Sequence, residues 1–300
     1  MSQTLSGVLI FCLSLAVLST LDASGKWVLS VGVPVFIAAW FRYLIHFLLI
    51  ATLVCSRGEL RLFRSKTFRF QLLRGAVILF ATVCFFSALS YLPQAQATTL
   101  VFLAPLIVLA LAPWLLNEPK RMSRWIAAGT GFIGVLIVIR PGAGLAPMGI
   151  IFGLLTACLL AAQHLCTRKV AIDHPLTTML WSGLVGATIM TLALPWLWPS
   201  FETIIHELTF WQWCVLLSLG LTGALGHLLQ IQSYRLSPAS LLAPFMYLQI
   251  VAAAALGWAI WGDFPDPISW MGIGLICASG ACIGAYEWHV ANRRRRAQQQ

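Results

Sequence analysis

The sequence predicts an all-α membrane protein with ten transmembrane helices arranged as two inverted five-helix repeats. Hydrophobic residues make up 60% of the 300 residues and charged residues 9%, whereas soluble domains carry roughly one-quarter charged residues. Only helices and closed barrels satisfy their backbone hydrogen bonds in lipid, and the apolar runs are too long and continuous for barrel strands. The composition therefore predicts a helical bundle in lipid, and an internal similarity predicts the repeat.

Residues 91–142 show the repeating unit most clearly. They contain two apolar runs, 96–116 and 125–139, each near the ~20 residues that cross ~30 Å of hydrocarbon. A short charged turn, Asn117-Glu118-Pro119-Lys120-Arg121, joins the two runs. A weaker copy of this hairpin lies 145 positions further on, where Pro93 corresponds to Pro238, Glu118 to Asp263, Trp125 to Trp270 and Gly129 to Gly274.

Ten spans can be placed in order along the chain. They cover residues 5–24, 34–55, 70–90, 95–116, 123–140, 147–168, 176–198, 209–233, 238–261 and 268–288. The repeat divides them into a first five-helix unit over 1–144 and a second, inverted unit over 145–290, followed by a basic tail over 291–300. The first apolar run is long and lacks a basic leader, so we expect a retained span and not a signal peptide.

Basic residues are distributed unequally between the two sides of this topology. The loops on the side of both termini hold Arg57, Arg61, Arg64, Lys66, Arg69, Lys120, Arg121, Arg124, Arg168, Lys169, Arg235 and Arg293 to Arg296. The opposite loops hold Lys26 and Arg140, beside Glu202, Glu207, Asp263 and Asp266. Basic loops resist translocation, so both termini are predicted to be cytoplasmic in a bacterial inner membrane. A nucleic-acid patch at the basic tail is the less favoured explanation of the net charge of +10.

The repeat offset spans five helices, which is an odd number. The second copy therefore enters the membrane in the opposite orientation, with Glu118 on the cytoplasmic face and Asp263 on the outer face. Inverted repeats are typical of secondary transporters, in which exchange of the two halves' conformations opens one site to each side in turn. The alternative is a duplication that produced only a convenient bundle.

No cofactor or metal site is predicted. The eight cysteines are scattered, mostly within apolar runs, and form no Cys-x-x-Cys pair, so neither a disulfide framework nor a zinc site is indicated. Residues 129–134 match GxGxxG, but they lie inside a span, without the preceding strand and following acidic residue of a dinucleotide site. Close helix packing explains these glycines better, as it does Gly280 and Gly284.

Short motifs extend over nearly the whole chain. The first half contains Trp40-x-Arg42-Tyr43, Arg74-Gly75, Ala88-Leu89-x-Tyr91-x-Pro93, Phe102-Leu103-Ala104-Pro105-Leu106, Glu118, Arg124-Trp125, Gly131-Phe132-x-Gly134 and Arg140-Pro141-Gly142. The second contains Gly226-His227, Ala243-Pro244-Phe245-x-Tyr247, Gly257 and Gly262-Asp263-x-Pro265-Asp266. Together they resemble the drug/metabolite transporter superfamily, specifically its ten-span EamA-type branch.

The resemblance implies two bundles around a central cavity, lined by the first, third, fourth, sixth, eighth and ninth spans, with alternating access. It leaves the substrate open, because relatives are associated with amino acids, S-adenosylmethionine, riboflavin, amino-acid-derived metallophores and drugs. One departure is Asp263, where many members of the family have glutamate.

Asp22 and Arg42 are ionisable groups inside predicted spans, where each costs several kcal/mol unless it is paired or hydrated. Arg42 lies some 8 residues, roughly 12 Å, below the outer surface, at a depth where Asp22 can meet it. One interpretation is a clamp for a zwitterion, in which Arg42 grips a carboxylate through its planar fork and Asp22 binds an amine. The favoured alternative is a structural ion pair, because the second span is not a usual cavity-lining helix in relatives.

Two histidines, His164 and His227, are predicted in the inner half of the membrane. An imidazole can exchange a proton near neutral pH, so protons are a candidate coupling ion. Gln230 and Gln249 are predicted to hydrogen-bond a polar substrate. The alternative for all four is hydrogen bonding between helices, worth about 1 kcal/mol each.

Tyrosines and prolines complete the candidate site. Tyr91, Tyr234 and Tyr247 are predicted to wall the cavity, with core packing as the alternative. Pro105 and Pro244 each remove a backbone hydrogen bond and bend their helices, so they are candidate hinges or fixed kinks. Glu118 and Asp263 are predicted to bind the N-termini of the helices that follow them.

These observations predict a secondary transporter that moves a small polar or zwitterionic metabolite across the inner membrane by alternating access, with export favoured. The substrate class is an amino acid or an amino-acid-derived compound such as a metallophore. The predicted partners are this metabolite, the lipid bilayer and candidate protons, without nucleic acid, and the assembly is a monomer or weak dimer. One alternative is uptake of S-adenosylmethionine or riboflavin, and another is an intramembrane metal-dependent enzyme, for which no clustered nucleophile and base are visible.

Overall fold

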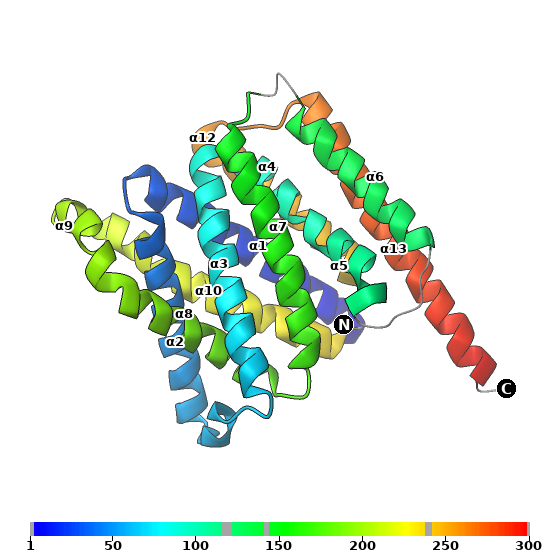
Figure 1. The fold of residues 1–300 in the computed structure, drawn as a ribbon, viewed down its shortest axis with the longest axis horizontal. Coiled ribbons are helices and arrows are strands. Elements are labelled where there is room, and N and C mark those ends of the chain that lie inside the picture. Colours follow the sequence, from blue (N-terminus) through cyan, green and yellow to red (C-terminus); the bar gives the residue numbers. More distant parts are fainter. Residues whose placement is uncertain (1–2, 116–121, 141–143, 238–241, 299–300) are drawn as a thin grey trace.

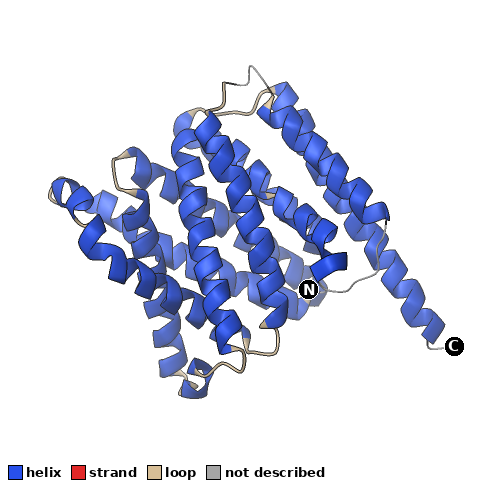
Figure 2. Cartoon of the chain, viewed as in Figure 1, coloured by secondary structure: helices blue, strands red, loops and turns tan. Residues whose placement is uncertain are grey.

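The computed structural model describes residues 3–115, 122–140, 144–237 and 242–298. These residues form helices and short connections and contain no strand (Figure 2). Six of the described helices are long and apolar enough to cross a bilayer: α1 (Gln3–Ser30), α2 (Val35–Ser56), α3 (Phe68–Tyr91), α7 (Pro147–Lys169), α8 (Pro175–Leu197) and α10 (Phe210–Leu236). The all-α membrane fold predicted from composition is confirmed.

Four shorter apolar segments correspond to the remaining predicted spans. They are α4 (Gln94–Val101) with α5 (Leu103–Leu115), α6 (Met122–Ile139), η2 (Ala243–Tyr247) with α12 (Leu248–Trp261), and α13 (Pro267–Gln298). Two short helices, η1 (Leu60–Phe63) and α9 (Pro199–Ile205), lie in connections. The helix α13 continues without a break through most of the residues predicted as a separate basic tail.

Local sequence signals explain where several helices begin and end. Proline occupies the first turn of α7, α8 and α9, where its missing N–H costs no helical hydrogen bond. A capping box begins α10, because the Thr209 N–H donates to Gln212 Oε1 at 2.7 Å and the Gln212 N–H donates back to Thr209 Oγ1. Gly262 ends α12 with a φ of 74°, a conformation that favours glycine.

The fourth span is interrupted, as its proline predicts. The helix α4 ends at Val101 and α5 begins at Leu103, with a turn at Phe102 between them. Pro105 has no N–H to donate to the carbonyl of Val101, four residues earlier, and its ring crowds that carbonyl. The structure thus shows an interruption three residues before Pro105. In the ninth span, Pro244 lies in η2, which leads directly into α12.

Helices pair between the two halves of the chain (Figure 1). The helix α1 lies along α10, and the corresponding helices of the other half, α7 and α3, lie along each other. The corresponding helices α2 and α8 also pack together, as do α6 and α13, which lie side by side at one edge of the molecule. This is the contact pattern that two equivalent units related by a two-fold axis would make.

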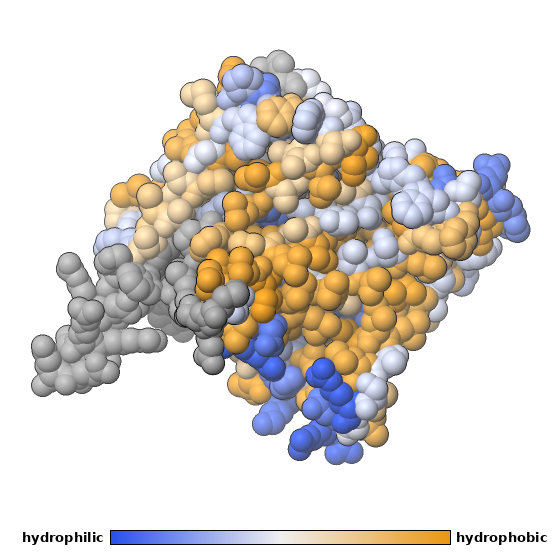
Figure 3. All heavy atoms as spheres, turned by 180° about the vertical axis from the view of Figure 1, so that it is seen from behind, coloured by the Kyte–Doolittle hydropathy of each residue, from blue (hydrophilic) through white to orange (hydrophobic). Residues whose placement is uncertain are grey.

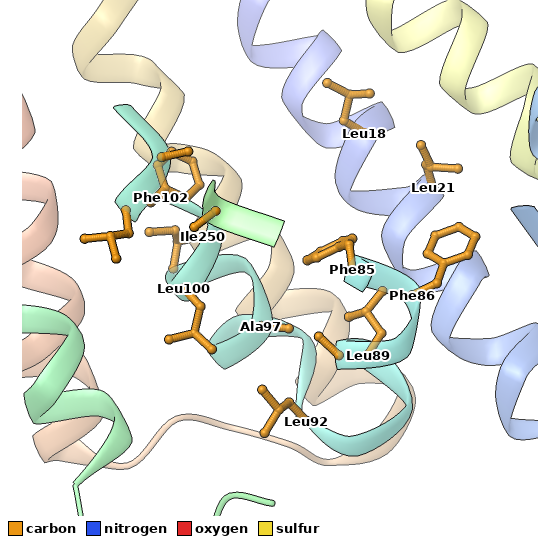
Figure 4. Packing of buried hydrophobic residues seen from close by; sticks show 14 of the residues in the cluster. Leu18, Leu21, Phe85, Phe86, Leu89, Leu92, Ala97, Leu100, Phe102 and Ile250 are labelled. Atoms are coloured by element: carbon orange, nitrogen blue, oxygen red, sulfur yellow. The ribbon is translucent and has the colours of Figure 1, made fainter. Parts of the chain in front are cut away.

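A continuous apolar core joins the helices near the middle of the molecule. Figure 4 shows Leu18 and Leu21 of α1 near Phe85 and Phe86 of α3, and all four belong to one buried cluster. Large apolar side chains also cover the outward faces of the helices, where lipid would contact them. The space-filling view shows this apolar surface as a broad orange area, with hydrophilic side chains gathered towards its lower edge (Figure 3).

Two of the three glycines in the GxGxxG match lie in close contact with neighbouring helices. A Cβ atom on Gly131 would overlap Leu106 at 1.9 Å, and one on Gly134 would lie 2.9 Å from the carbonyl oxygen of Gly272 in α13. A Cβ atom on Gly129 would meet nothing within 4 Å. The packing explanation is therefore confirmed for Gly131 and Gly134 and wrong for Gly129, which lies on an open face of α6.

Candidate functional site

Asp22 of α1 is buried among helices of both halves. Its side chain is 7% exposed, and Gln249 Nε2 of α12 donates to Asp22 Oδ2 at 3.5 Å. Arg42 of α2 lies near enough to act on Asp22 electrostatically, but the two described side chains form no ion pair within 4.0 Å. The structure therefore does not show the direct ion pair that was favoured from the sequence.

Arg42 is surrounded by rings and small residues. Its guanidinium carbon lies 5.6 Å from the ring centre of Tyr43 and 5.7 Å from that of Phe86. Gly223 of α10 lies beside the side chain, because a Cβ atom there would be 3.9 Å from Arg42 Nε. Aromatic faces attract a cation, but among the described residues no acceptor is hydrogen-bonded to this guanidinium. Its donors are available to a ligand.

Gln249 and Gln94 connect α1 with α12 and α4. Ser19 Oγ donates to the backbone carbonyl of Gln249 at 3.3 Å, and Gln94 Nε2 donates to the backbone carbonyl of Ser19 at 2.9 Å. Asp22 and Ser19 lie about one helical turn apart on the same face of α1. The result is a polar cluster of Ser19, Asp22, Arg42, Gln94 and Gln249 contributed by four helices, which we call the Asp22 cluster.

The short helix α4 carries further buried polar groups. Three of its side-chain oxygens are buried without a hydrogen-bond partner: Gln94 Oε1, Gln96 Oε1 and Thr98 Oγ1. Buried polar groups in proteins almost always have a partner in protein, water or ligand. Gln94 and Thr98 lie one turn apart on one face of α4, and Gln96 lies on the opposite face. The oxygens of Gln94 and Thr98 therefore mark a face that water or a polar ligand can satisfy. The sequence signal was the polar run Gln94–Thr99 inside an apolar span, which was treated only as the start of a helix.

His227 of α10 faces His46 and not His164. The ring centres of His46 and His227 are 6.4 Å apart. His46 is 8% exposed, and its Nε2 atom has no hydrogen-bond partner. The side chain of His164 in α7 is exposed. His46, interpreted from sequence only as a neighbour of Arg42, is thus the histidine placed beside His227.

The tyrosines lie in three different environments. Tyr91 is 51% exposed at the end of α3 and stacks on Phe152, and Tyr234 is 47% exposed beside Phe11. Tyr247 is buried, with its ring 5.3 Å from that of Phe102. Its hydroxyl occupies the space above Gly280, where a Cβ atom would lie 1.2 Å away. The structure brings only Tyr247 into the core that surrounds α4 and α12.

Charged residues at the outer end form two ion pairs. Lys26 Nζ lies 2.9 Å from Asp263 Oδ2, and Arg140 Nη2 lies 2.9 Å from Asp266 Oδ1. Asp266, not Asp263, caps α13, because it accepts from the backbone N–H of Ser269 at 2.9 Å. That bond, together with Arg140, holds the pKa of Asp266 below its ordinary value. The prediction that Asp263 caps the last helix was wrong, while Glu118 lies outside the described residues.

At the opposite end, Asp173 joins the α7–α8 turn to the start of α3. It accepts from Thr67 Oγ1 at 2.7 Å, from the Lys66 backbone at 2.9 Å and from Gln71 Nε2 at 3.0 Å, and also from Ser65 Oγ. Burial alone would raise the pKa of Asp173, but these hydrogen bonds outweigh it and lower the pKa. The sequence analysis missed this residue because its partners lie more than 100 positions away.

The comparisons with known proteins agree with this architecture. Residues 5–140 and 147–285 match the model of the EamA-like transporter family. An S-adenosylmethionine uptake transporter of Rickettsia conorii (strain ATCC VR-613 / Malish 7) is 28% identical, over 98% of this chain and 97% of the relative. A Riboflavin transporter of Vibrio cholerae is 27% identical over 88% of this chain and 87% of the relative.

Two further similarities extend over most of the molecule. The Pseudopaline exporter CntI of Pseudomonas aeruginosa is 28% identical, over 93% of this chain and 95% of the relative. A solved crystal structure superimposes with a TM-score of 0.62 at 20% identity, over 92% of this chain and 96% of that one, and supports the fold alone. The family and these relatives are metabolite transporters and not enzymes. The resemblance drawn from the short motifs is confirmed, and the chain belongs to the EamA-like transporter family.

Proposed function

We propose that this metabolite transporter binds a small zwitterionic, amino-acid-derived substrate at the Asp22 cluster and moves it by alternating access. One observation carries the proposal: Asp22 and Arg42 lie inside the bundle, near one another, without a direct ion pair. Two opposite charges separated in this way can each take one end of a zwitterion, a carboxylate at Arg42 and an amine at Asp22. Gln249 then orients the carboxylate of Asp22.

The unpartnered oxygens of α4 support a polar ligand in the same region. Gln94 belongs to the Asp22 cluster through Ser19, and its Oε1 atom has no partner. A substrate amine or hydroxyl can donate to such an oxygen, which a hydrocarbon ligand cannot do. We infer that the central cavity implied by the family resemblance lies between α1, α2, α4 and α12.

The break in the fourth span and the 3-10 turn in the ninth are candidate hinges for the alternation. Phe102 lies between α4 and α5, and Tyr247 is the last residue of η2, directly before α12, at positions 145 residues apart. Their rings are in contact. Irregular helix segments at corresponding positions of two repeats are a feature of transporters with inverted topology. Pro105 lies beside the first and Pro244 within the second, and we propose that they keep the two segments free to change their angle.

Reconstitution in liposomes tests the function. Vesicles that contain the purified protein and a trapped unlabelled compound are mixed with the same labelled compound, and counterflow is measured above empty vesicles. The panel contains amino acids, opine-type metallophores, S-adenosylmethionine and riboflavin. Each compound is loaded from either side of the membrane, and export is measured first. We expect counterflow with amino-acid-derived zwitterions. Counterflow with riboflavin alone would contradict the zwitterion site.

The variant Arg42→Gln tests the site itself. It removes the guanidinium and its charge but keeps a shorter polar side chain, so we expect at least about tenfold weaker substrate binding with little loss of folded protein. Arg140→Gln is the matched control, because Arg140 is bound to Asp266 at the outer end. If Arg42→Gln lowers folded yield but leaves binding intact, Arg42 is structural.

A further inference from the structure

The charges inside the helices do not balance. Lys26 is neutralised by Asp263. The other described charged side chains more than about one turn from a helix end are Asp22, Arg42 and Arg74. Two guanidinium groups therefore face one carboxylate in the low-dielectric part of the molecule, where an uncompensated charge costs several kcal/mol. No second described carboxylate inside the helices offsets these two groups, so an anionic ligand would complete the balance.

Arg74 of α3 is held by neutral groups only. Its Nε atom donates to Thr167 Oγ1 of α7 at 2.9 Å, and its Nη1 atom donates to Ser182 Oγ of α8. Both hydroxyls donate their own protons to backbone carbonyls, Thr167 to Gln163 and Ser182 to Thr178. These bonds orient the guanidinium but leave its charge uncompensated, and no described residue is bonded to its Nη2 atom.

Arg42 and Arg74 lie near the same buried residues. Tyr43, next to Arg42, is bonded to the carbonyl of Ile78, one turn after Arg74 on α3. A Cβ atom on Gly183, next to the Ser182 that binds Arg74, would lie 2.9 Å from the ring of His46. Tyr43 is occupied, because its hydroxyl is bonded to Ile78 and Thr82. His46 is more than nine-tenths buried, and its Nε2 atom has no partner. Buried polar atoms almost always have a partner in protein, water or ligand, so this nitrogen leaves a polar position that water or a ligand can fill.

We propose that Arg74 is a second anion-binding residue, so that the substrate is an acidic amino-acid-type compound with two carboxylates. This inference rests on the proposed function. The α-amino and α-carboxylate groups bind at Asp22 and Arg42, and the second carboxylate binds the free edge of Arg74. Its negative charge completes the balance of two arginines against one aspartate. A planar guanidinium held by two oriented hydroxyls suits a carboxylate better than a flexible lysine would.

Matched acids and amides test the proposal. Counterflow and its inhibition are measured with aspartate, glutamate and 2-aminoadipate, each beside the amide that replaces its second carboxylate. We expect wild-type protein to prefer the acid by at least about tenfold for the best-fitting length. Arg74→Gln should remove this preference while flux of the amide remains, and Arg74→Lys should retain part of it.

Controls separate binding from folding. Thr167→Val removes a neutral partner of Arg74, so it should lower the thermal stability of the protein without reversing the preference for acids. Arg140→Gln should change neither the thermal stability nor the preference for acids. Two results would overturn the inference and leave the transporter assignment intact. One is equal flux of acids and amides through the wild-type protein. The other is an equal loss of acid flux and amide flux in Arg74→Gln. If wild-type protein gives no counterflow with any zwitterion, the proposed function itself fails.

Discussion

Single glycines determine how closely α6 and α13 approach each other. The carbonyl oxygen of Gly134 lies 2.7 Å from the position of a Cβ atom on Gly272, and the reverse contact is 2.9 Å. Real Cβ atoms are not found so close to a backbone oxygen, which cannot rotate away as a side chain can. Helices in lipid associate through such close contacts of small residues, because no hydrophobic force drives them together.

The substitution Gly134→Ala should therefore destabilise the protein by about 1–3 kcal/mol, the usual cost of overpacking. Thermal unfolding of the detergent-solubilised protein measures the loss. Gly129→Ala is the matched control on the same helix, because a Cβ atom there meets nothing within 4 Å. Alanine favours a helix over glycine, so the control should be neutral or slightly stabilising. Equal losses in both variants would show that α6 and α13 do not cross at Gly134.

At the scale of elements, the turn between α7 and α8 ties two distant segments together. Asp173 is bonded to the residues that begin α3, and the next residue, His174, accepts from the Leu176 N–H at 3.2 Å and so caps α8. Arg235, near the end of α10, lies 3.3 Å from the other ring nitrogen of His174. One turn thus connects α3, α8 and α10 at the end of the bundle where the predicted cytoplasmic loops lie.

The substitution Asp173→Asn should lower stability at neutral pH, because the amide accepts fewer and weaker hydrogen bonds than the carboxylate. The sign of the pH dependence follows from the lowered pKa of Asp173 in the folded protein. The stabilisation is complete above the unfolded pKa of about 3.9 and is lost as pH falls towards the folded value. The gap in melting temperature between wild type and variant should thus stay constant from about pH 5 to 8. A gap that closes near neutral pH would contradict a lowered pKa.

For the whole molecule, the decisive property is the orientation of the two halves. The contact pairs α1 with α10 and α7 with α3 agree with two equivalent units. Basic residues concentrate at the end of the bundle that holds Arg57 and Asp173, and acidic pairs at the other. The positive-inside rule therefore predicts that both termini are cytoplasmic.

Labelling of introduced cysteines with a membrane-impermeant reagent in intact cells tests that orientation. Met122→Cys and Phe264→Cys are suitable, because these side chains are 74% and 60% exposed. Met122 begins α6, and Phe264 precedes the corresponding helix α13. We expect labelling at position 264 and protection at 122.

Leu60→Cys, 62% exposed in η1, is the control for the cytoplasmic side. The native exposed cysteines, Cys55, Cys158 and Cys282, are first replaced by serine. Labelling of 122 and 264 from one side would contradict the inverted repeat.

The sequence by itself determined the membrane class, the ten helical segments and the break near Pro105. Each of these depends on local properties: apolar length, turn residues and the missing N–H of proline. It also indicated Asp22, Arg42, His227 and Gln249 as candidates, because polar groups are rare and costly inside spans. Their interior positions are visible without knowledge of their neighbours.

Only the tertiary structure decided which of these groups meet. Gln249 reaches Asp22 across 227 positions, His227 faces His46 and not His164, and Lys26 pairs with Asp263 where a helix cap was expected. Arg74 was noted only as part of a motif and not as a site residue, because its partners lie on α7 and α8, far along the chain. The physical reason is common to all four: periodicity places a residue on a helix face, whereas helix crossing and rotation determine which faces touch.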